Sequence, residues 1–301
     1  MPRNTKLTPE RDIPILLFLW KWKLSTTAAL YLKFFGACTP KRAYNRLSEL
    51  KRGGFVEAKS LENRDKTAWV LTKKGFLAIR EELAPLREQG FASEHMAHDL
   101  VVSAVHQGDW FYRIPENREI LTEQEVRRLS FDEFPAWAPR TDLHRPDGYW
   151  HIRDGENSIT VALEVELNQK KLSNYSRATE FYSYYKNINC VLWVVPSVGK
   201  AQSILREMTR NSTESSNHDF VLLSDFYRHG WQSTMVVGPN TGKTISNLLR
   251  GNAGGGPAVT PAHPSLETRR YSHISMSYKF SATPSSVYCV AHAPFSQNPQ
   301  F

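Results

Sequence analysis

The stretch TPKRAYNRLSELKRGG, residues 39–54, decides the fold of the N-terminal third of the chain. Thr39 is a favourable N-cap, and Pro40 suits the first helical position, where its missing N–H costs nothing. Gly53 ends the pattern, and between these residues the apolar side chains recur at helical spacing: Ala43, Leu47 and Leu50. The pattern predicts an amphipathic helix whose outer face carries Lys41, Arg42, Asn45 and Arg46.

Further elements are expected on both sides of this helix. One helix is predicted over 9–23, and a second begins after the cap Ser25-Thr26-Thr27 and ends at Gly36. Two short strands are predicted over 55–59 and 67–71, joined by a polar turn over 62–66, and a fourth helix over 72–83. The order helix–helix–helix–strand–turn–strand predicts a winged-helix domain over residues 1–90.

The charge of the chain is concentrated in this domain. The formal net charge of the chain is +8, and residues 1–90 hold eighteen Lys or Arg against nine Asp or Glu. This asymmetry favours a polyanionic partner for the N-terminal region, with double-stranded DNA as the prediction. The third helix and the wing turn supply the expected contacts: Lys41, Arg42, Asn45, Arg46, Arg64 and Lys66. The alternative is that these residues only solvate a helix face.

Composition limits the class of protein. A hydrophobic fraction of 41% and a charged fraction of 23% are typical of a globular chain. Cys38, Cys190 and Cys289 are too few and too widely spaced for a disulfide framework or a zinc site. The apolar run that ends at Lys23 is far shorter than the ~20 residues that a membrane span needs. We therefore expect a cytoplasmic protein with no membrane partner.

A second domain, of the α/β class, is expected over residues 91–231. Its most informative part is a predicted hairpin, in which segments 144–152 and 158–167 supply two strands that flank an Asp-Gly turn. The second strand is apolar enough to be buried, yet alternation places Glu164 and Glu166 on one face of it. Two carboxylates on a buried strand are costly unless a partner, water or a metal offsets them.

The chain after this hairpin predicts the rest of a mixed sheet flanked by helices. A tyrosine-rich helix is expected over 169–187, a buried strand over 190–196, a helix over 200–210 and a strand over 220–223. Residues 232–301, rich in Gly and Pro, are expected to form a disordered tail. Gly238–Thr244 is similar to a phosphate-binding loop but has one residue too few between its glycines.

These features together resemble a known family. Asp147 after Pro146, followed by Glu164-x-Glu166 on the next strand, is similar to the PD-(D/E)xK restriction-endonuclease-like core. With the upstream winged helix, residues 9–225 resemble the plasmid replication-relaxation family. The resemblance implies that Asp147 and Glu164 hold Mg²⁺, which prefers carboxylate oxygens and activates an attacking water.

The sequence departs from the motif where the motif has lysine. Glu166 stands at that position, and Lys170 or Lys171 could reach back to substitute for it. The catalytic candidates are therefore Asp147, Glu164, Glu166, Lys170 and Lys171, and Asp99 or Glu94 could add a carboxylate. Without a migrated lysine, the domain would serve binding only. The structural alternative is that Asp147 caps a turn and that the two glutamates lie on a solvated sheet face.

Three functions follow from these patterns. The first is a DNA-binding protein of a plasmid or mobile element that acts in replication, relaxation or mobilisation, with a second domain that binds DNA or cleaves or nicks it with Mg²⁺. The second is a winged-helix transcriptional regulator with an inactive nuclease-like domain. The third is an adaptor that grips protein. A homodimer, or complexes with other replication or mobilisation proteins, would suit the first.

His95 and His98 are interpreted as ordinary surface or core histidines.

Overall fold

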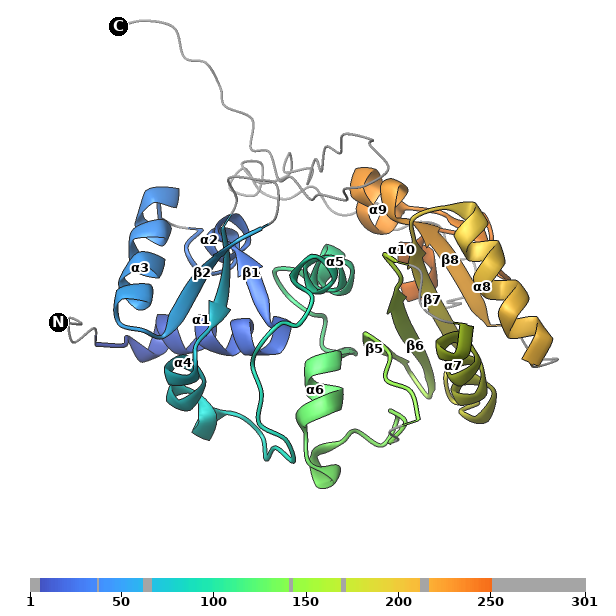
Figure 1. Ribbon diagram of the computed structural model, residues 1–301, viewed down its shortest axis with the longest axis horizontal. Coiled ribbons are helices and arrows are strands. Elements are labelled where there is room, and N and C mark those ends of the chain that lie inside the picture. The colour runs from blue at the N-terminus through green and yellow to red at the C-terminus, as the bar shows by residue number, and fades with distance from the viewer. Residues whose placement is uncertain are drawn as a thin grey trace, which may run out of the picture.

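The chain folds into a helix-rich N-terminal part and a larger α/β part that lie side by side (Figure 1). The structure is a computed structural model, and it describes residues 6–36, 38–61, 67–140, 143–168, 172–211 and 217–250. Among these residues, none of the helices combines the length and the apolar character that crossing a bilayer requires.

The N-terminal part packs its helices on a three-stranded antiparallel sheet of order β1-β3-β2. Its apolar core includes Leu16, Leu30, Leu47 and Trp69, one from each of three helices and a strand. The elements are α1 Pro9–Trp22, β1 Leu24–Thr26, α2 Thr27–Phe34, α3 Pro40–Arg52, β2 Val56–Ser60, β3 Thr67–Leu71, α4 Lys73–Ala78 and a 3-10 turn Arg80–Glu82.

The observed order matches the predicted one, with two differences. Leu24–Thr26 forms strand β1, which the sequence analysis did not predict, because its three residues pair with β3 (Leu24 opposite Val70). The fourth helix ends at Ala78 rather than continuing to 83. Thr26 caps α2 by accepting the N–H of Ala29, as expected, whereas Thr39 begins α3 without a side-chain capping bond. The turn predicted over 62–66 lies outside the described residues.

The second part is built on a six-stranded mixed sheet of order β4-β5-β6-β7-β8-β9. β4, β5 and β6 are antiparallel, β6, β7 and β8 are parallel, and β9 returns antiparallel. The strands are β4 Arg118–Thr122, β5 Gly148–Asp154, β6 Asn157–Val165, β7 Cys190–Val195, β8 His218–Leu222 and β9 Met235–Val237.

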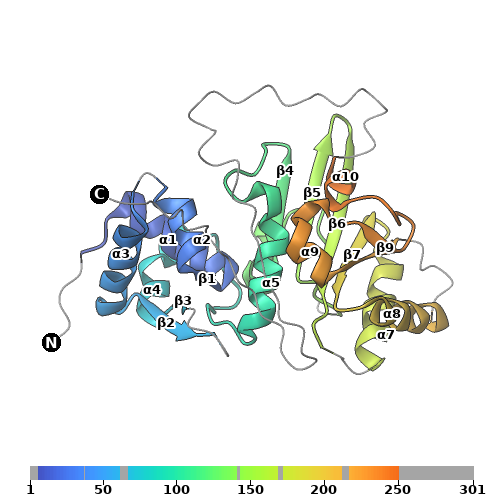
Figure 2. The ribbon, with the colours of Figure 1, turned by 90° about the horizontal axis from the view of Figure 1, so that it is seen from above.

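Helices cover both faces of this sheet, so its central strands are buried. The helices are α5 Met96–Gln107, α6 Glu123–Arg128, α7 Leu172–Tyr184, α8 Val198–Asn211, α9 Leu223–His229 and α10 Ile245–Leu249, with 3-10 turns Gly108–Trp110, Phe131–Glu133 and Gly230–Gln232. α5 lies between the N-terminal part and the sheet, and α7 and α8 lie on the far face (Figure 2). The apolar clusters on the two faces of the sheet match this arrangement. Leu163 and Val165 of β6 belong to the cluster that contains α5 residues, and Ala162 belongs to the cluster that contains α7 residues.

Two segments differ from the sequence-based expectation. Residues 118–128, for which the sequence analysis predicted no element, form the edge strand β4 and α6, in which Leu121 and Gln124 are buried. Residues 232–250, expected to belong to the disordered tail, form β9 and α10, so the prediction was wrong for them. The buried carboxylate of Asp219 holds the turn after β9 by accepting the backbone and side-chain N–H groups of Asn240. Residues 251–301 lie outside the described residues.

The two parts share a core at the end of α1. Trp22 belongs to the apolar cluster of the large sheet, and its ring centroid lies 5.8 Å from that of His106 on α5. Trp20 donates its indole N–H to the carbonyl of Gly90, and Lys21 pairs with Glu125 on α6 at 2.9 Å. The end of α1 is thus inserted between elements of the second part.

Candidate functional site

The outer face of α3 is the first candidate site. Lys41, Arg42 and Asn45, three of the predicted DNA contacts, are all exposed there, and Tyr44 between them has 54% of its surface exposed. The face therefore presents two cations, an amide and an aromatic ring. Arg64 and Lys66, predicted to contact DNA from the wing, lie outside the described residues.

Arg46, the fourth predicted contact on α3, does not lie on the outer face. Its Nε donates to Asp12 Oδ1 at 3.1 Å, a second guanidinium nitrogen pairs with Oδ2, and a third contacts Glu49 at 2.6 Å. Asp12 is fully buried in α1. Burial pushes the pKa of Asp12 up, but hydrogen bonds from Arg46, Thr8 and Arg11 outweigh it and hold the pKa below its ordinary value. The prediction of an outward Arg46 was wrong, because a buried carboxylate holds it.

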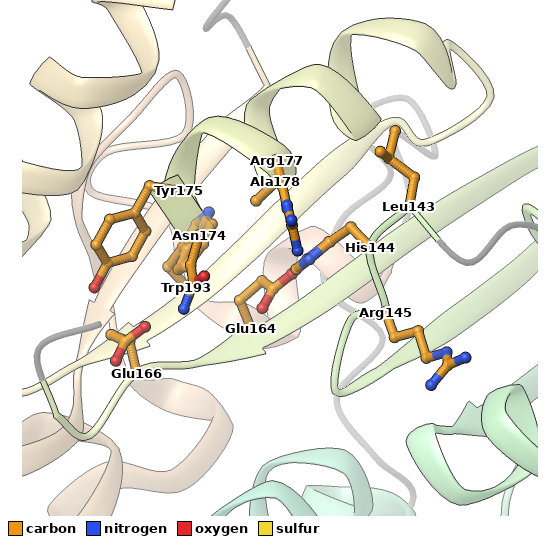
Figure 3. Close-up of a pocket in the computed structure, with 10 residues that line it drawn as sticks. All are labelled: Leu143, His144, Arg145, Glu164, Glu166, Asn174, Tyr175, Arg177, Ala178 and Trp193. Carbon is orange, nitrogen blue, oxygen red and sulfur yellow. The ribbon is translucent and has the colours of Figure 1, made fainter. Parts of the chain in front are cut away.

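The second candidate site is a pocket of about 360 Å³ on the α7 face of the large sheet (Figure 3). Its floor is formed by β6 and β7, and its walls by α7 and by the segment that precedes β5. The lining residues are Leu143, His144, Arg145, Glu164, Glu166, Asn174, Tyr175, Arg177, Ala178 and Trp193. Both predicted glutamates are therefore on one face, as the alternation along β6 indicated.

Glu164 is held by two donors in this pocket. Its Oε1 accepts the hydroxyl of Tyr182 at 2.5 Å and lies 2.5 Å from His144 Nε2, while only 2% of the residue is exposed. Burial raises the pKa of Tyr182 well above its ordinary value, and the negative charge of Glu164 raises it further. Tyr182 therefore stays protonated and acts as a donor at neutral pH, which offsets part of the cost of burying the carboxylate.

Glu166 follows the last residue of β6 and continues the alignment of the strand. Its N–H donates to the carbonyl of Val194 at 2.9 Å, and only 1% of the residue is exposed. Arg145 and Arg177 line the same pocket and are exposed. In Figure 3 the Arg145 side chain extends away from the other lining residues. The pocket thus combines two carboxylates, an imidazole and two guanidinium groups.

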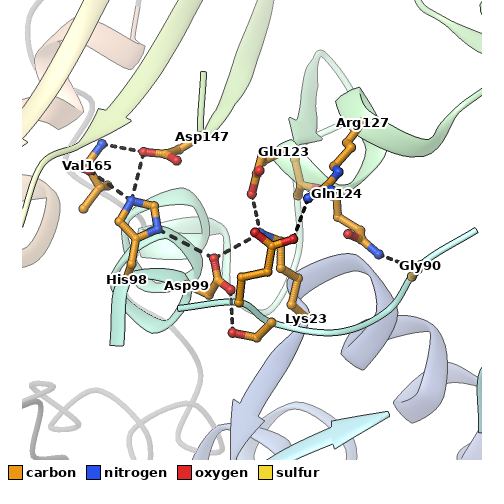
Figure 4. Close-up of polar contacts among 12 residues, drawn as sticks. Lys23, Gly90, His98, Asp99, Glu123, Gln124, Arg127, Asp147 and Val165 are labelled. Carbon is orange, nitrogen blue, oxygen red and sulfur yellow. Dashed lines mark hydrogen bonds and ion pairs between the residues drawn. The ribbon is translucent and has the colours of Figure 1, made fainter. Parts of the chain in front are cut away.

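Asp147, the other predicted metal ligand, makes its contacts toward α5 (Figure 4). Its Oδ2 accepts the N–H of Val165 at 2.6 Å and lies 3.4 Å from His98 Nε2. The same His98 nitrogen lies 3.0 Å from the carbonyl oxygen of Val165. The aspartate therefore joins the start of β5 to the end of β6.

A chain of charged groups continues from His98 into the N-terminal part (Figure 4). His98 Nδ1 lies 3.6 Å from Asp99 Oδ1, which is 3.1 Å from Lys23 Nζ, and Lys23 also pairs with Glu123. Burial alone would lower the pKa of His98, but the carboxylates of Asp147 and Asp99 outweigh it and raise this pKa to about 10. Asp99 and Glu94 were possible additional site carboxylates. Asp99 belongs to the series of charged groups that includes His98 and Lys23, and Glu94 pairs with Arg127 at 3.0 Å.

The predicted Mg²⁺ ligands do not fit a metal as arranged. Carboxylate oxygens suit Mg²⁺ in their chemistry. However, Glu164 is engaged by donors on the α7 face, and Asp147 is engaged by His98 on the α5 face. Within the described ranges, there is no group of three or more His, Cys, Asp or Glu side chains that could hold a metal ion. Lys170 and Lys171, the predicted replacements for the motif lysine, lie outside those ranges.

Sequence reasoning missed three residues that complete these arrangements. His98 was set aside as an ordinary histidine, yet it contacts Asp147. His144 lies only three residues before Asp147 in the sequence, so the motif itself could have pointed to it. Tyr182 was noticed only as part of a tyrosine-rich helix, and no local pattern indicates that its hydroxyl reaches Glu164.

Comparisons with known proteins add little to this geometry. No protein family model matches the chain, and no curated protein matches it in sequence. Among solved structures, the restriction endonuclease FokI is similar at a TM-score of 0.21 and 9% sequence identity. The match covers 71% of this chain, which spans 40% of the FokI chain. A TM-score of this size does not establish a common fold.

Proposed function

We propose that the protein binds double-stranded DNA through its N-terminal domain, acting as a winged helix with α3 as the recognition helix. The observation that carries the proposal is the exposed face of Lys41, Arg42 and Asn45 on a helix of a domain with a net positive charge. The strand order β1-β3-β2 behind the helices supports the same assignment.

The chemistry of this face suits a duplex. Lysine and arginine contact phosphates, and an asparagine on a helix in the major groove can bond an adenine edge. Tyr44, exposed on the same helix, can make apolar contact with a thymine methyl group. Arg46 has a different role, since it neutralises the buried Asp12.

DNA binding is tested by titrating the full chain into a fluorescent random-sequence duplex at several salt concentrations. Phosphate contacts release counterions, so the affinity should fall steeply and log-linearly as salt rises. A chain that does not bind the duplex at low salt, or that binds it with no salt dependence, would contradict the proposal. Either result would favour the adaptor function, in which the domain grips protein.

Metal-dependent strand cleavage is a second candidate function. It is favoured by the pocket whose lining includes the buried Glu164 and Glu166 together with Arg145 and Arg177. Mg²⁺ at Asp147 and Glu164, with Lys170 or Lys171 in place of the motif lysine, rests on the resemblance to PD-(D/E)xK nucleases and not on the donor geometry. Supercoiled plasmid with Mg²⁺ tests it: nicking by wild type but not by Asp147→Ala/Glu164→Ala supports cleavage. DNA binding without breakage supports the regulator instead.

The biological setting is proposed on the resemblance alone. The segments Arg145-Pro146-Asp147-Gly148 and 162–167 resemble the plasmid replication-relaxation family, which points to replication, relaxation or mobilisation of a plasmid or mobile element. Self-association or complexes with other replication or mobilisation proteins would accompany that role. Sedimentation of the chain alone and with plasmid DNA tests for a homodimer.

A further inference from the structure

The start of β5 is tied to its neighbours by the backbone and the side chain of one residue. The backbone N–H of Asp147 donates to the carbonyl of Leu163 at 2.9 Å, and its own carbonyl accepts the N–H of Glu123 at 3.2 Å. Its carboxylate adds the bond to the N–H of Val165, just beyond the point where β5 stops pairing with β6. Asp147 therefore continues the strand pairing with its side chain.

Two oxygens at this corner face the same ring nitrogen. His98 Nε2 lies 3.0 Å from the carbonyl oxygen of Val165 and 3.4 Å from Asp147 Oδ2. A carbonyl and a carboxylate oxygen converging on one point is the kind of donor arrangement that a hard divalent cation uses. In this protein His98 Nε2 is at that point.

The imidazole is held in place from its other side. Asp99, which lies 3.6 Å from His98 Nδ1, accepts the hydroxyl of Ser93 at 2.6 Å and pairs with Lys23 at 3.1 Å. The side chain of Asp99 is almost fully buried, and that of Lys23 is 14% exposed. The ring is thus part of a packed network between the two parts of the molecule and not a surface side chain that has folded back.

We infer that His98 occupies the place beside Asp147 that the nuclease resemblance assigns to a divalent cation, so that Asp147 fastens β5 to β6 and holds no metal. His98 is a positioning residue, because it contacts the carbonyl oxygen of Val165 and the carboxylate of Asp147 and so holds them in place. It lies on the sheet face opposite the pocket of Glu164. Asp147 therefore has a structural role at the junction of β5 and β6. Any cation bound by Glu164 and Glu166 in the pocket would bind without Asp147.

Cation binding by the full chain tests this inference, with Mn²⁺ as the probe because free Mn²⁺ is measured directly by electron paramagnetic resonance. Wild type and Asp147→Asn are titrated side by side. Asparagine keeps an oxygen that can accept the N–H of Val165, so this variant preserves the corner. The expected result is the same Mn²⁺ isotherm for both proteins. A tenfold or larger weakening of Mn²⁺ binding in Asp147→Asn would overturn the inference.

A second comparison tests the role of His98 itself. His98→Ala removes the ring and should take up one more Mn²⁺ per chain than wild type. The added binding should disappear in His98→Ala/Asp147→Asn. His95→Ala, at an exposed position one turn earlier, is the matched control and should bind as wild type does. A His98→Ala protein with a wild-type circular dichroism spectrum but no added Mn²⁺ would contradict the inference.

These outcomes are independent of DNA binding. If His98→Ala is not folded, His98→Ser serves in the same comparison, and the wild-type and Asp147→Asn pair still decides whether Asp147 holds a cation. A chain that fails to bind duplex DNA, and so contradicts the proposed function, still gives a complete Mn²⁺ comparison.

Discussion

Arg46 on α3 and Asp12 on α1 form a bidentate ion pair in the interior of the N-terminal domain. The pair joins the helix proposed to contact DNA to the helix that enters the second part of the molecule. It stabilises the position of α3, and this leads to the first prediction.

Arg46→Met should destabilise the protein by about 3 kcal/mol at pH 7, since it leaves a buried carboxylate without its main partner. The folded-state pKa of Asp12 lies below its ordinary value. The stabilisation is therefore present above that ordinary value and is lost as the pH falls through the lowered pKa. Urea unfolding at pH 7 and pH 3 measures both effects. Arg42→Met, exposed on the same helix, should change stability by less than about 0.5 kcal/mol. Equal effects of the two substitutions would contradict the structural role of Arg46.

Lys41→Ala and Arg42→Ala should weaken duplex binding without changing the unfolding free energy. Each loss of a phosphate contact should make the slope of log affinity against log salt less negative by about 1. Fluorescence anisotropy at several salt concentrations measures this slope. Arg113→Ala is the control, since Arg113 is an exposed arginine outside α3 that pairs with Glu116. If all three variants bind as wild type does, α3 is not the recognition helix.

Gly148→Ala should destabilise the protein by at least about 2 kcal/mol. Gly148 has a φ of 148°, and a Cβ there would lie 2.4 Å from His106 Nε2 and 2.6 Å from the carbonyl oxygen of Leu121. Thermal unfolding followed by circular dichroism measures the loss. Gly199→Ala in helix α8 meets no close neighbour and should be neutral or stabilising by up to about 1 kcal/mol. Similar melting temperatures for wild type and Gly148→Ala would show that the corner has more room than the structure gives it.

Acid should destabilise the protein partly through His218. This residue is buried against Trp193, whose indole N–H donates to His218 Nδ1 at 3.0 Å, and burial lowers its pKa to about 4. A histidine with a lowered pKa stabilises the fold above its ordinary pKa of about 6.5, and this stability is lost as the pH falls toward 4.

The effect is at most roughly 3 kcal/mol for this histidine. Urea unfolding between pH 7 and pH 4 should show a smaller acid loss in His218→Gln than in wild type. Part of the loss remains, because burial also lowers the pKa of His106 to about 4. His95→Gln, at an exposed histidine, should follow the wild-type curve. An unchanged pH dependence in His218→Gln would exclude this residue as a source of acid sensitivity.

Local patterns predict much of this fold. Helical spacing of apolar residues locates α1 to α3, the Asp-Gly turn locates the β5–β6 hairpin, and strand alternation places Glu164 and Glu166 on one face. β1 escaped prediction because a three-residue strand forms only through its pairing with β3, far along the chain. The fold of 232–250 escaped it for a similar reason, since Asn240 is held by the buried carboxylate of Asp219.

The candidate sites show the same limit more sharply. A helical pattern assigns Arg46 to the polar face of α3 but does not indicate that Asp12, 34 residues earlier, pairs with it. Likewise the motif identifies Asp147 and Glu164, whereas their partners His98 and Tyr182 come from helices on opposite faces of the sheet. Residue types at the site follow from sequence, but the partners that decide what those residues can bind come from packing.

Trp22 has a consequence for how this protein can be divided. Its indole completes the core beneath the large sheet, although its place in the chain is within α1. A fragment that begins at residue 91 would have a hole in that core, and a fragment that ends at residue 90 would expose a tryptophan to water. We therefore expect both parts to melt in one cooperative transition, so an N-terminal fragment grafted onto another protein would lose the neighbour that stabilises it.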